Sequence, residues 1–429
     1  MPSGSMAQAA IMIKQVHTIR SDQYRRQPRW FTLLNKLWLQ TYPLGTKSVL
    51  TKESLVKAAI KATGFDDFGN DIWEEPLEVM LQSIREEACL HPVGQFITRQ
   101  RIINLLSVRL RAEHYFKKYP EILEQELYPC MVIVGLQRTG TTKLQRLLAA
   151  DPDNRSILSW EALNPAPVKD DVKTGKERIK IAKTSVKALK VMSPGFFAIH
   201  PIEYEAPEED VLLLDVSFMS TTAEATMNVP SYAAWLEKTD QSPAYGYMVK
   251  LMKLLQWQRP AKRWVLKTPH HLEFLPQVKK HFGEVQLIWT HRKVNECIPS
   301  FLSMISYSRI LFSKEVDQNA LAKQWVRKNG YMLSKALEYR NGHGHITHYT
   351  DISYQELLEN AEGVIKKIYQ ERGEKISPEL MAIFEASNRA NPKGKYGTHQ
   401  YHLADFGIDD HYLHRHTEKY ERFQKSLGI

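Results

Sequence analysis

The pattern of hydrophobic and polar positions divides the chain into two regions. From about Arg29 to Tyr119, apolar residues recur every three to four positions, as in "EPLEVMLQSIREEACLH", and no strand-like run interrupts them. This period is typical of amphipathic helices. Beyond Pro129, short apolar runs alternate with helical patterns. The pattern therefore predicts a helical N-terminal subdomain over 29–127 and an α/β domain over 128–429.

Short apolar runs bounded by charged or turn residues predict the strands of the second region. They are Met131–Val134, "RSILSW", "RWVL", "VQLIWT" and "HITHYTDIS". Helices are predicted between them, among them the lysine-rich "GKERIKIAKTSVKALKVM" and "APEEDVLLLDVSF", where acidic residues suit the first turn of a helix. Strands that alternate with helices form a parallel sheet flanked by helices. Ligands bind such sheets beyond the carboxyl ends of the strands.

Composition narrows the class of protein only slightly. Of the 429 residues, 43% are hydrophobic and 25% are charged, as in a soluble globular enzyme. The net charge of +10 favours an anionic ligand, without distinguishing nucleic acid, a membrane surface or a small phosphorylated molecule. The cysteines, Cys89, Cys130 and Cys297, form no C-x-x-C pair, so we expect reduced thiols and neither a disulfide framework nor a zinc knuckle.

The location of the protein is predicted from what the sequence lacks. Charged residues interrupt every apolar run before it reaches the length of a membrane span. The first residues, "MPSGSMAQAA", have no apolar core of the kind found in secretory signals. We expect residues 1–28 to be a disordered lead-in or a cloning remnant, and the protein to be cytoplasmic. Oligomeric state is not readable from the sequence.

The segment "MVIVGLQRTGTTKLQRLL" has the layout of a phosphate-binding loop. A buried strand is followed by Gly135, Arg138, Gly140 and then leucines at helical spacing. In this layout, backbone N–H groups and a helix N-terminus converge on an anion. A loop for nucleoside triphosphates needs lysine directly after the second glycine. Thr141 stands there instead, and Arg138 is the cation inside the loop.

Polar residues also follow two further predicted strands. "RWVL" is followed by Lys267, Thr268, His270 and His271, and "VQLIWT" by His291 and Arg292. If the sheet is parallel, these residues lie along one edge together with the loop. They then form an electropositive rim around it. The alternative for Lys267 or Arg292 is a structural ion pair or helix cap.

On these residues the chain resembles the sulfotransferases that use 3′-phosphoadenosine 5′-phosphosulfate (PAPS), in their broad, mostly bacterial branch. The resemblance covers roughly residues 75–425 and implies the sulfotransferase fold, with a P-loop-like parallel sheet. It implies that the loop holds the 5′-phosphosulfate, that Arg292 and Ser300, eight positions apart, bind the 3′-phosphate, and that a late loop closes over that phosphate. The loop residues are Gln137, Arg138, Thr139, Gly140, Thr141 and Thr142, and the late loop contains Lys393, Gly394, Lys395 and Gly397.

The resemblance also implies the reaction, an in-line transfer of a sulfuryl group from PAPS to an acceptor hydroxyl, without a metal. Arg138 and Lys267 would stabilise charge on the sulfuryl oxygens and the leaving phosphate. Pro269 occupies the position at which the cytosolic branch has its catalytic histidine, and the bacterial pattern favours His271 as general base. The rival bases are His270, His200 and Glu209.

Three other functions compete with this interpretation. A P-loop kinase or NTPase would need the missing lysine and a metal-binding aspartate at a strand end. A nucleic-acid-binding protein would interleave aromatic residues with its lysines, and the tract richest in lysine has no such aromatic residues. A catalytically silent nucleotide-binding protein would keep Arg292 and Ser300 without a base. For the acceptor, the apolar helical front and residues 160–260 suggest a small hydrophobic molecule with a hydroxyl group.

Overall fold

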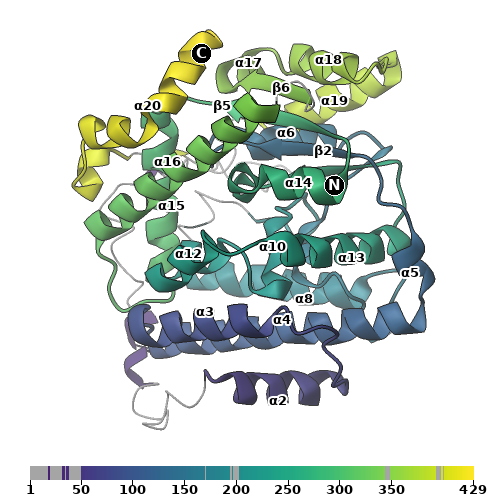
Figure 1. The fold of residues 1–429 in the computed structure, drawn as a ribbon, viewed down its shortest axis with the longest axis vertical. Coiled ribbons are helices and arrows are strands. Elements are labelled where there is room, and N and C mark those ends of the chain that lie inside the picture. Colours follow the sequence, from purple (N-terminus) through teal and green to yellow (C-terminus); the bar gives the residue numbers. More distant parts are fainter. Residues whose placement is uncertain are drawn as a thin grey trace, which may run out of the picture.

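The helices of the N-terminal region form a layer at one end of the molecule, away from the sheet (Figure 1). The computed structural model describes residues 18–19, 31–33, 35–37, 50–169, 171–193, 196, 202–343, 348–392, 398–399 and 401–429. The helices of this layer are α2 (Lys52–Thr63), α3 (Glu74–Glu87), α4 (Pro92–Lys118) and the short α5 (Glu121–Glu124). Thr51 caps α2 by accepting a hydrogen bond from the Ser54 N–H, and Gly64 ends it with a positive φ of 74°. The prediction of an all-helical front is confirmed for the described residues.

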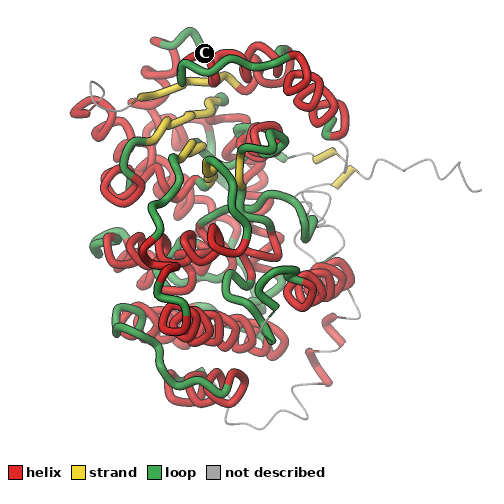
Figure 2. The backbone as a smooth tube through the Cα atoms, turned by 90° about the vertical axis from the view of Figure 1, so that its right-hand side faces the viewer, coloured by secondary structure: helices red, strands yellow, loops and turns green. Residues whose placement is uncertain are grey.

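The sheet of the second region has five parallel strands in the order β3-β4-β2-β5-β6. These are β3 (Asn154–Arg155), β4 (Arg263–Lys267), β2 (Cys130–Val134), β5 (Val285–His291) and β6 (His348–Ser353). The predicted parallel sheet flanked by helices is confirmed (Figures 1 and 2). Because β2 lies in the middle, the loop that follows it emerges between the ends of β4 and β5.

Both faces of the sheet are covered, which explains why its central strands are apolar without alternation. On one face, Met131 and Ile133 of β2 pack with Leu144 of α6 (Thr141–Leu148) and with the helices that follow β6. On the other face, Val132 and Val134 join a larger core that reaches the N-terminal helices. The site-forming loop is therefore anchored in a strand with no exposed residue.

The remaining elements connect and cover these strands. They are α7 (Ser159–Leu163), α8 (Lys176–Met192), α10 (Val211–Leu214), η3 (Asp215–Ser217), α11 (Thr222–Thr226), α12 (Pro230–Leu236), α13 (Ser242–Gln258), η4 (Pro269–Glu273), α14 (Leu275–Phe282), α15 (Val294–Ile310), α16 (Gln318–His343), α17 (Tyr354–Glu359), α18 (Ala361–Glu371), α19 (Pro378–Ala390), η5 (Leu403–Phe406) and α20 (Asp410–Ser426).

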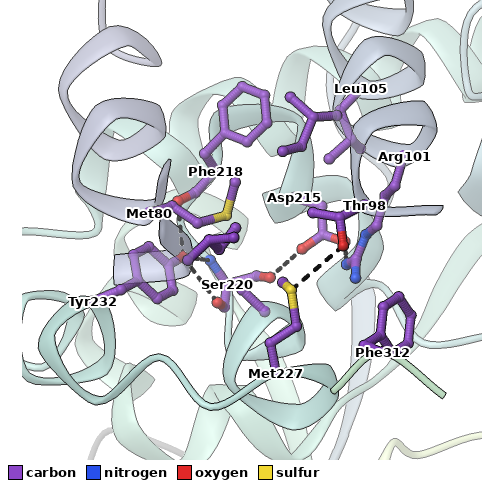
Figure 3. Close-up of a pocket in the computed structure, with 13 residues that line it drawn as sticks. Met80, Thr98, Arg101, Leu105, Asp215, Phe218, Ser220, Met227, Tyr232 and Phe312 are labelled. Carbon is purple, nitrogen blue, oxygen red and sulfur yellow. Dashed lines mark hydrogen bonds and ion pairs between the residues drawn. The ribbon is translucent and has the colours of Figure 1, made fainter. Parts of the chain in front are cut away.

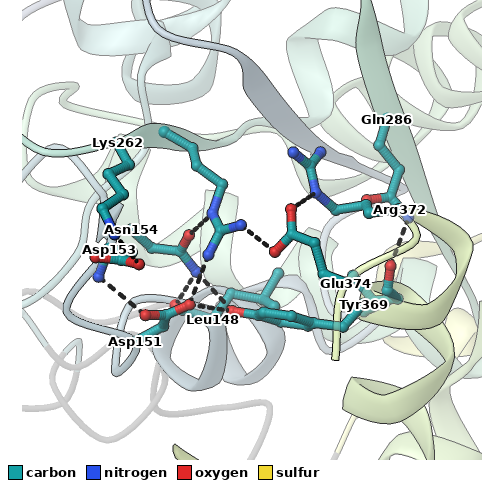
Figure 4. A network of polar contacts seen from close by, with 11 residues as sticks. Leu148, Asp151, Asp153, Asn154, Lys262, Gln286, Tyr369, Arg372 and Glu374 are labelled. Atoms are coloured by element: carbon teal, nitrogen blue, oxygen red, sulfur yellow. Dashed lines mark hydrogen bonds and ion pairs between the residues drawn. The ribbon is translucent and has the colours of Figure 1, made fainter. Parts of the chain in front are cut away.

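At the amino ends of β3 and β4, a polar network holds the sheet edge to α18 (Figure 4). Arg263 pairs with Asp151 over 2.8 Å and also with Glu374. The hydroxyl of Tyr369 donates to the same Asp151 carboxylate, over 2.5 Å. Asn154 accepts a hydrogen bond from Arg263 Nε. This network lies at the end of the sheet opposite the candidate site, so its role is structural.

Two predicted elements differ from the structure. The strand predicted for "RSILSW" ends at Arg155, because Ser159 already begins α7 and only an isolated bridge at Leu158 continues the extended chain. The helix predicted for "APEEDVLLLDVSF" begins only at Val211, with the single turn α10, and continues as the 3-10 turn η3 to Ser217. The acidic residues before it, Glu209 and Asp210, contact Lys267 at the end of β4 and do not form a first helical turn. These tertiary contacts override the local sequence pattern.

A small second sheet involves the stretch expected to be a disordered lead-in. The strand β1 (Thr18–Ile19) pairs in parallel with β7 (Thr398–His399). The partners lie at opposite ends of the chain, so hydrophobic patterning within either segment gives no sign of the pairing. Part of the predicted lead-in is thus attached to the C-terminal region.

Candidate active site

The loop between β2 and α6 turns sharply because two glycines adopt backbone conformations that other residues rarely accept. Gly135 has φ 144°, and a Cβ there would lie 2.4 Å from Thr290 Oγ1 at the end of β5. Gly140, at φ 93°, is the N-cap of α6, and a Cβ would come within 2.9 Å of the Tyr354 ring. Between them, Thr139 is buried and its hydroxyl shares a hydrogen bond of 2.7 Å with Thr290 Oγ1. The loop is therefore locked against β5 and opens at the N-terminus of α6.

Arg138 is the loop residue with the most unusual conformation, a non-glycine at φ 69°. Such a conformation costs about 1–3 kcal/mol and persists only where contacts hold it. Two contacts do so: Arg138 Nε donates to Ser300 Oγ over 3.0 Å, and its carbonyl accepts from Arg292 Nη1 over 3.0 Å. Burial lowers the pKa of the Arg138 guanidinium, and the positive charge of Arg292 lowers it further. Two cations thus lie together at the mouth of the loop.

Arg292 follows β5 directly and is held on three sides. Its Nε donates to Glu296 over 3.0 Å, and its guanidinium lies 4.4 Å from the centre of the Tyr354 ring. Gln424 Nε2 donates to its carbonyl. Burial opposes the charge of Arg292, but the hydrogen bond with Glu296 and the electrostatic effects of Tyr354, Tyr401 and Glu296 together outweigh burial, and the pKa is raised. The guanidinium is therefore a fixed cation, oriented before any ligand arrives.

The end of β4 carries a second charged group. Lys267, whose side chain is 2% exposed, pairs with Glu209 over 2.8 Å. Thr268 Oγ1 donates to the other carboxylate oxygen of Glu209 over 3.3 Å. The side chain of Glu209 is 27% exposed. The chain next to Glu209 contacts α6, because Gln145 Nε2 donates a hydrogen bond to the Glu208 carbonyl. This contact holds the partly exposed Glu209 carboxylate at the same edge of the sheet as the loop.

The two histidines of η4 have different surroundings. His271 is fully buried, with Nδ1 2.7 Å from the Tyr245 hydroxyl and Nε2 3.3 Å from Asp210. Asp210 also accepts from the Lys267 backbone N–H, over 3.0 Å, so it ties the histidine to the end of β4. His270 packs against the Phe274 ring, and no described group hydrogen-bonds either of its ring nitrogens. Burial, assisted by the positive charges of His271 and Lys328, lowers the pKa of His270 well below its usual value.

Most of the predicted site residues are at this edge of the sheet. The loop residues Gln137 to Gly140 lie between β4 and β5, Thr141 is buried in the first turn of α6, and Thr142 is exposed beside it. Gln137 Oε1 is buried and no described group donates to it. His200, Lys393, Gly394, Lys395 and Gly397 lie outside the described residues. Within the described part of the chain, no group of three or more His, Cys, Asp or Glu side chains is arranged to hold a metal ion.

Sequence reasoning missed several residues that shape the site. Tyr245, which contacts His271, and Tyr354, which stacks on Arg292, carry no motif that marks them. Asp210 did carry a signal, since it directly follows the candidate Glu209. In the region predicted to line the acceptor cleft, a cavity lies between α3, α4 and residues 215–232 (Figure 3). Its volume of about 20 Å³ holds no more than a water molecule, so it is not an acceptor site.

Comparison with known proteins identifies the class. A model of the sulfotransferase family matches residues 129–379, more than half of the chain, and the protein therefore belongs to the sulfotransferase family. The resemblance inferred from the sequence is thus confirmed. Within the described residues, no helix is both long enough and apolar enough to cross a membrane.

Two solved sulfotransferases from mycobacteria share the fold. The crystal structure of STF1 from Mycobacterium tuberculosis is 27% identical, with a TM-score of 0.75 over 85% of this chain and 98% of its own. STF9 from Mycobacterium avium is 23% identical, with a TM-score of 0.78 over 86% of this chain and 95% of its own, a similarity of fold. A search of curated protein sequences gave no match.

Proposed function

We propose that this sulfotransferase transfers the sulfuryl group of PAPS to a hydroxyl group of a small, hydrophobic acceptor and releases adenosine 3′,5′-bisphosphate. The observation that carries the proposal is the contact of Arg138 with Ser300, 3.0 Å apart. It joins the residue proposed to bind the phosphosulfate with one proposed to bind the 3′-phosphate. A donor that carries both a 5′-phosphosulfate and a 3′-phosphate would contact both of these residues at once.

The residues at the loop fit a donor with two separate anionic groups. Arg138 and Arg292 are close enough for the charge of one to lower the pKa of the other. An anionic group bound between them relieves this repulsion and adds charge-assisted hydrogen bonds. In the proposal, the N–H groups of the loop and the first turn of α6, with the hydroxyls of Thr141 and Thr142, receive the phosphosulfate. Lys393, Gly394, Lys395 and Gly397 remain proposed contacts of the 3′-phosphate.

In this proposal, Lys267 stabilises negative charge on the donor and Glu209 accepts the proton of the acceptor hydroxyl. Without donor, the two charges neutralise each other over 2.8 Å. When the sulfuryl oxygens of the donor attract Lys267, Glu209 loses its partner and becomes available as a proton acceptor. Lys267 and Arg138 then stabilise the negative charge that develops on the leaving phosphate. The reaction needs little covalent participation by the protein, because the acceptor oxygen attacks sulfur as the bisphosphate departs.

For the general base, the geometry favours Glu209 over His271, the base favoured by the sequence. A base needs an open lone pair within hydrogen-bond reach of the acceptor hydroxyl. Glu209 is part exposed, whereas both ring nitrogens of His271 contact protein groups in a fully buried position. We assign His271 the role of a positioning residue, which holds Asp210 and through it the Lys267 backbone. His270, neutral and without a hydrogen-bonding partner among the described residues, is the next candidate.

The proposal is tested by thermal unfolding in the presence of nucleotides. Adenosine 3′,5′-bisphosphate without metal is expected to stabilise the protein by about 4 kcal/mol at a thousandfold excess over its Kd. ADP, which lacks the 3′-phosphate, should stabilise it far less. The Arg292→Ala variant serves as the control in which the bisphosphate stabilises the protein much less. Stabilisation by ATP with Mg²⁺ alone would contradict the proposal and favour a P-loop kinase.

A further inference from the structure

The helix α8 carries a regular stripe of exposed lysines. They are Lys176, Lys180, Lys183, Lys187 and Lys190. Their spacing of four, three, four and three residues keeps them on one side of a helix with 3.6 residues per turn. The helix also contains the buried Arg178, and its only acidic residue is Glu177. The stripe therefore presents a row of positive charge along the whole helix.

These charges are not neutralised by neighbouring acids. Among the described residues, no carboxylate forms an ion pair with any lysine of the stripe, and Glu177 instead pairs with Lys169. Lys183 lies over the Tyr204 ring, at 5.9 Å from its centre. By comparison, Lys279 and Lys366 on other surface helices each pair with a carboxylate. Uncompensated lysines at this spacing favour an anionic surface as partner.

The exposed surface of α8 also carries large apolar side chains: Val191 directly follows Lys190 and borders the lysine stripe, whereas Ile181 lies on the flank between the stripe and the buried residues. Val191 is 68% exposed and Ile181 is 39% exposed, so both rank among the most exposed large hydrophobic residues of the described chain. The helix buries only Arg178 and Ala182. Arg178 anchors it, with its guanidinium 4.6 Å from the centre of the Trp160 ring and a hydrogen bond to the Asn164 carbonyl. The helix is thus fixed along one side, and its lysines and exposed aliphatic side chains share the rest of its surface.

We propose that α8 docks this protein on an anionic lipid surface. Lysines attract an interfacial helix to anionic headgroups, while aliphatic side chains enter the boundary between headgroups and acyl chains. A nucleic acid or an acidic protein would use the lysines but has no need of exposed Ile181 and Val191. The proposal is independent of the nucleotide donor and of the catalytic residues. It states where this member of the sulfotransferase family would act, at an anionic membrane surface.

The test measures co-sedimentation of the full-length protein with two kinds of vesicle. One contains phosphatidylcholine alone, and the other contains phosphatidylcholine and phosphatidylglycerol in equal parts. We expect binding to the anionic vesicles only, and weaker binding as salt is raised. The triple variant Lys180→Gln/Lys183→Gln/Lys187→Gln should bind about a hundredfold more weakly. Ile181→Ser/Val191→Ser should weaken binding while leaving the charge unchanged.

A matched variant controls for net charge. Lys57→Gln/Lys61→Gln/Lys323→Gln removes the same charge from exposed positions on α2 and α16 and should bind the anionic vesicles like the unaltered protein. Equal losses in the two triple variants would overturn the proposal, because net charge rather than α8 would then govern binding. Absence of binding to anionic vesicles would overturn it as well. If Ile181→Ser/Val191→Ser bound the anionic vesicles as tightly as the unaltered protein, the aliphatic side chains would not insert, and a lipid surface would be contradicted as the partner.

Discussion

Arg138 Nε and Ser300 Oγ are joined by a hydrogen bond of 3.0 Å although 162 positions separate the two residues in the chain. The bond crosses from the loop after β2 to the helix after β5, which are neighbouring strands of the sheet. It helps to hold Arg138 in its positive-φ conformation. The geometry of the candidate donor site therefore depends on a tertiary contact between two motifs.

Ser300→Ala tests this contact. The substitution removes the hydrogen-bond acceptor of Arg138 Nε, and a bond to a charged group contributes about 1.5–3 kcal/mol. We expect the Kd for adenosine 3′,5′-bisphosphate, measured by calorimetry, to rise at least about tenfold. Ser308→Ala, on the same helix and away from the loop, should leave the Kd unchanged. An unaltered affinity in Ser300→Ala would remove Ser300 from the proposed site.

Arg292→Ala is expected to weaken donor binding more than it slows the chemical step. The guanidinium is oriented in advance by Glu296 and Tyr354, so it contributes to the affinity for phosphate at little ordering cost. The KM for PAPS should rise by about a hundredfold, with kcat nearly unchanged at saturating donor. Lys293→Ala removes an adjacent exposed charge and serves as the control. A fall in kcat with unchanged KM would place Arg292 in the chemical step instead.

Glu209→Gln and His271→Gln separate the candidate bases. Removal of a general base lowers kcat by about 10²–10⁴-fold and leaves donor binding intact. We expect this pattern for Glu209→Gln, whose amide still accepts a hydrogen bond from Thr268. His271→Gln should mainly lower the free energy of unfolding, because the side chain is fully buried between Tyr245 and Asp210. If His271→Gln instead abolished turnover with unchanged stability and Glu209→Gln remained active, the base would be His271.

His91 makes stability depend on pH. Its Nδ1 accepts a hydrogen bond from the Gly94 N–H at the start of α4, which requires the neutral ring, and burial lowers its pKa from 6.5 to about 4. The unfolded chain binds a proton below pH 6.5 while the folded protein stays neutral, so the contribution of His91 to stability is complete above pH 6.5 and is lost as the pH falls towards 4.

Urea unfolding of His91→Asn checks this dependence. Asparagine is also a good helix cap but does not titrate. The loss of stability between pH 8 and pH 5 should be about 2 kcal/mol smaller in the variant than in the unaltered protein. His411→Asn, at an exposed position, should retain the full loss. The same pH dependence in both variants would contradict the role of His91.

Arg263→Met should destabilise the protein without affecting the site. The arginine is 11% exposed and bridges Asp151 and Glu374, so its removal leaves two carboxylates without their main partner. We expect the free energy of unfolding to fall by about 3 kcal/mol. The Kd for the bisphosphate, measured well below the melting temperature, should not change, since the network lies at the opposite end of the sheet. A weakened affinity at full folding would show that the two ends are coupled.

The local parts of the site can be read from the amino-acid sequence alone. An apolar strand, two glycines and a helix give the loop after β2, because a strand buried on both faces must be apolar and because the turn requires positive φ. Lys267, the last residue of β4, and Arg292, which directly follows β5, were found in the same way. The order of these motifs was specific enough to indicate the family. The parallel sheet followed from strands that alternate with helices.

Which of these groups meet, and which remain accessible, depends on the packing of the whole chain. Local patterns do not encode the strand order β3-β4-β2-β5-β6, which places the loop between the ends of β4 and β5. They also do not place Tyr245 and Asp210 around His271, and this burial moves the preferred base to Glu209. The physical reason is that hydrophobic periodicity reports which side of an element faces the core. Contacts between side chains depend on the packing of distant elements, as between Arg138 and Ser300.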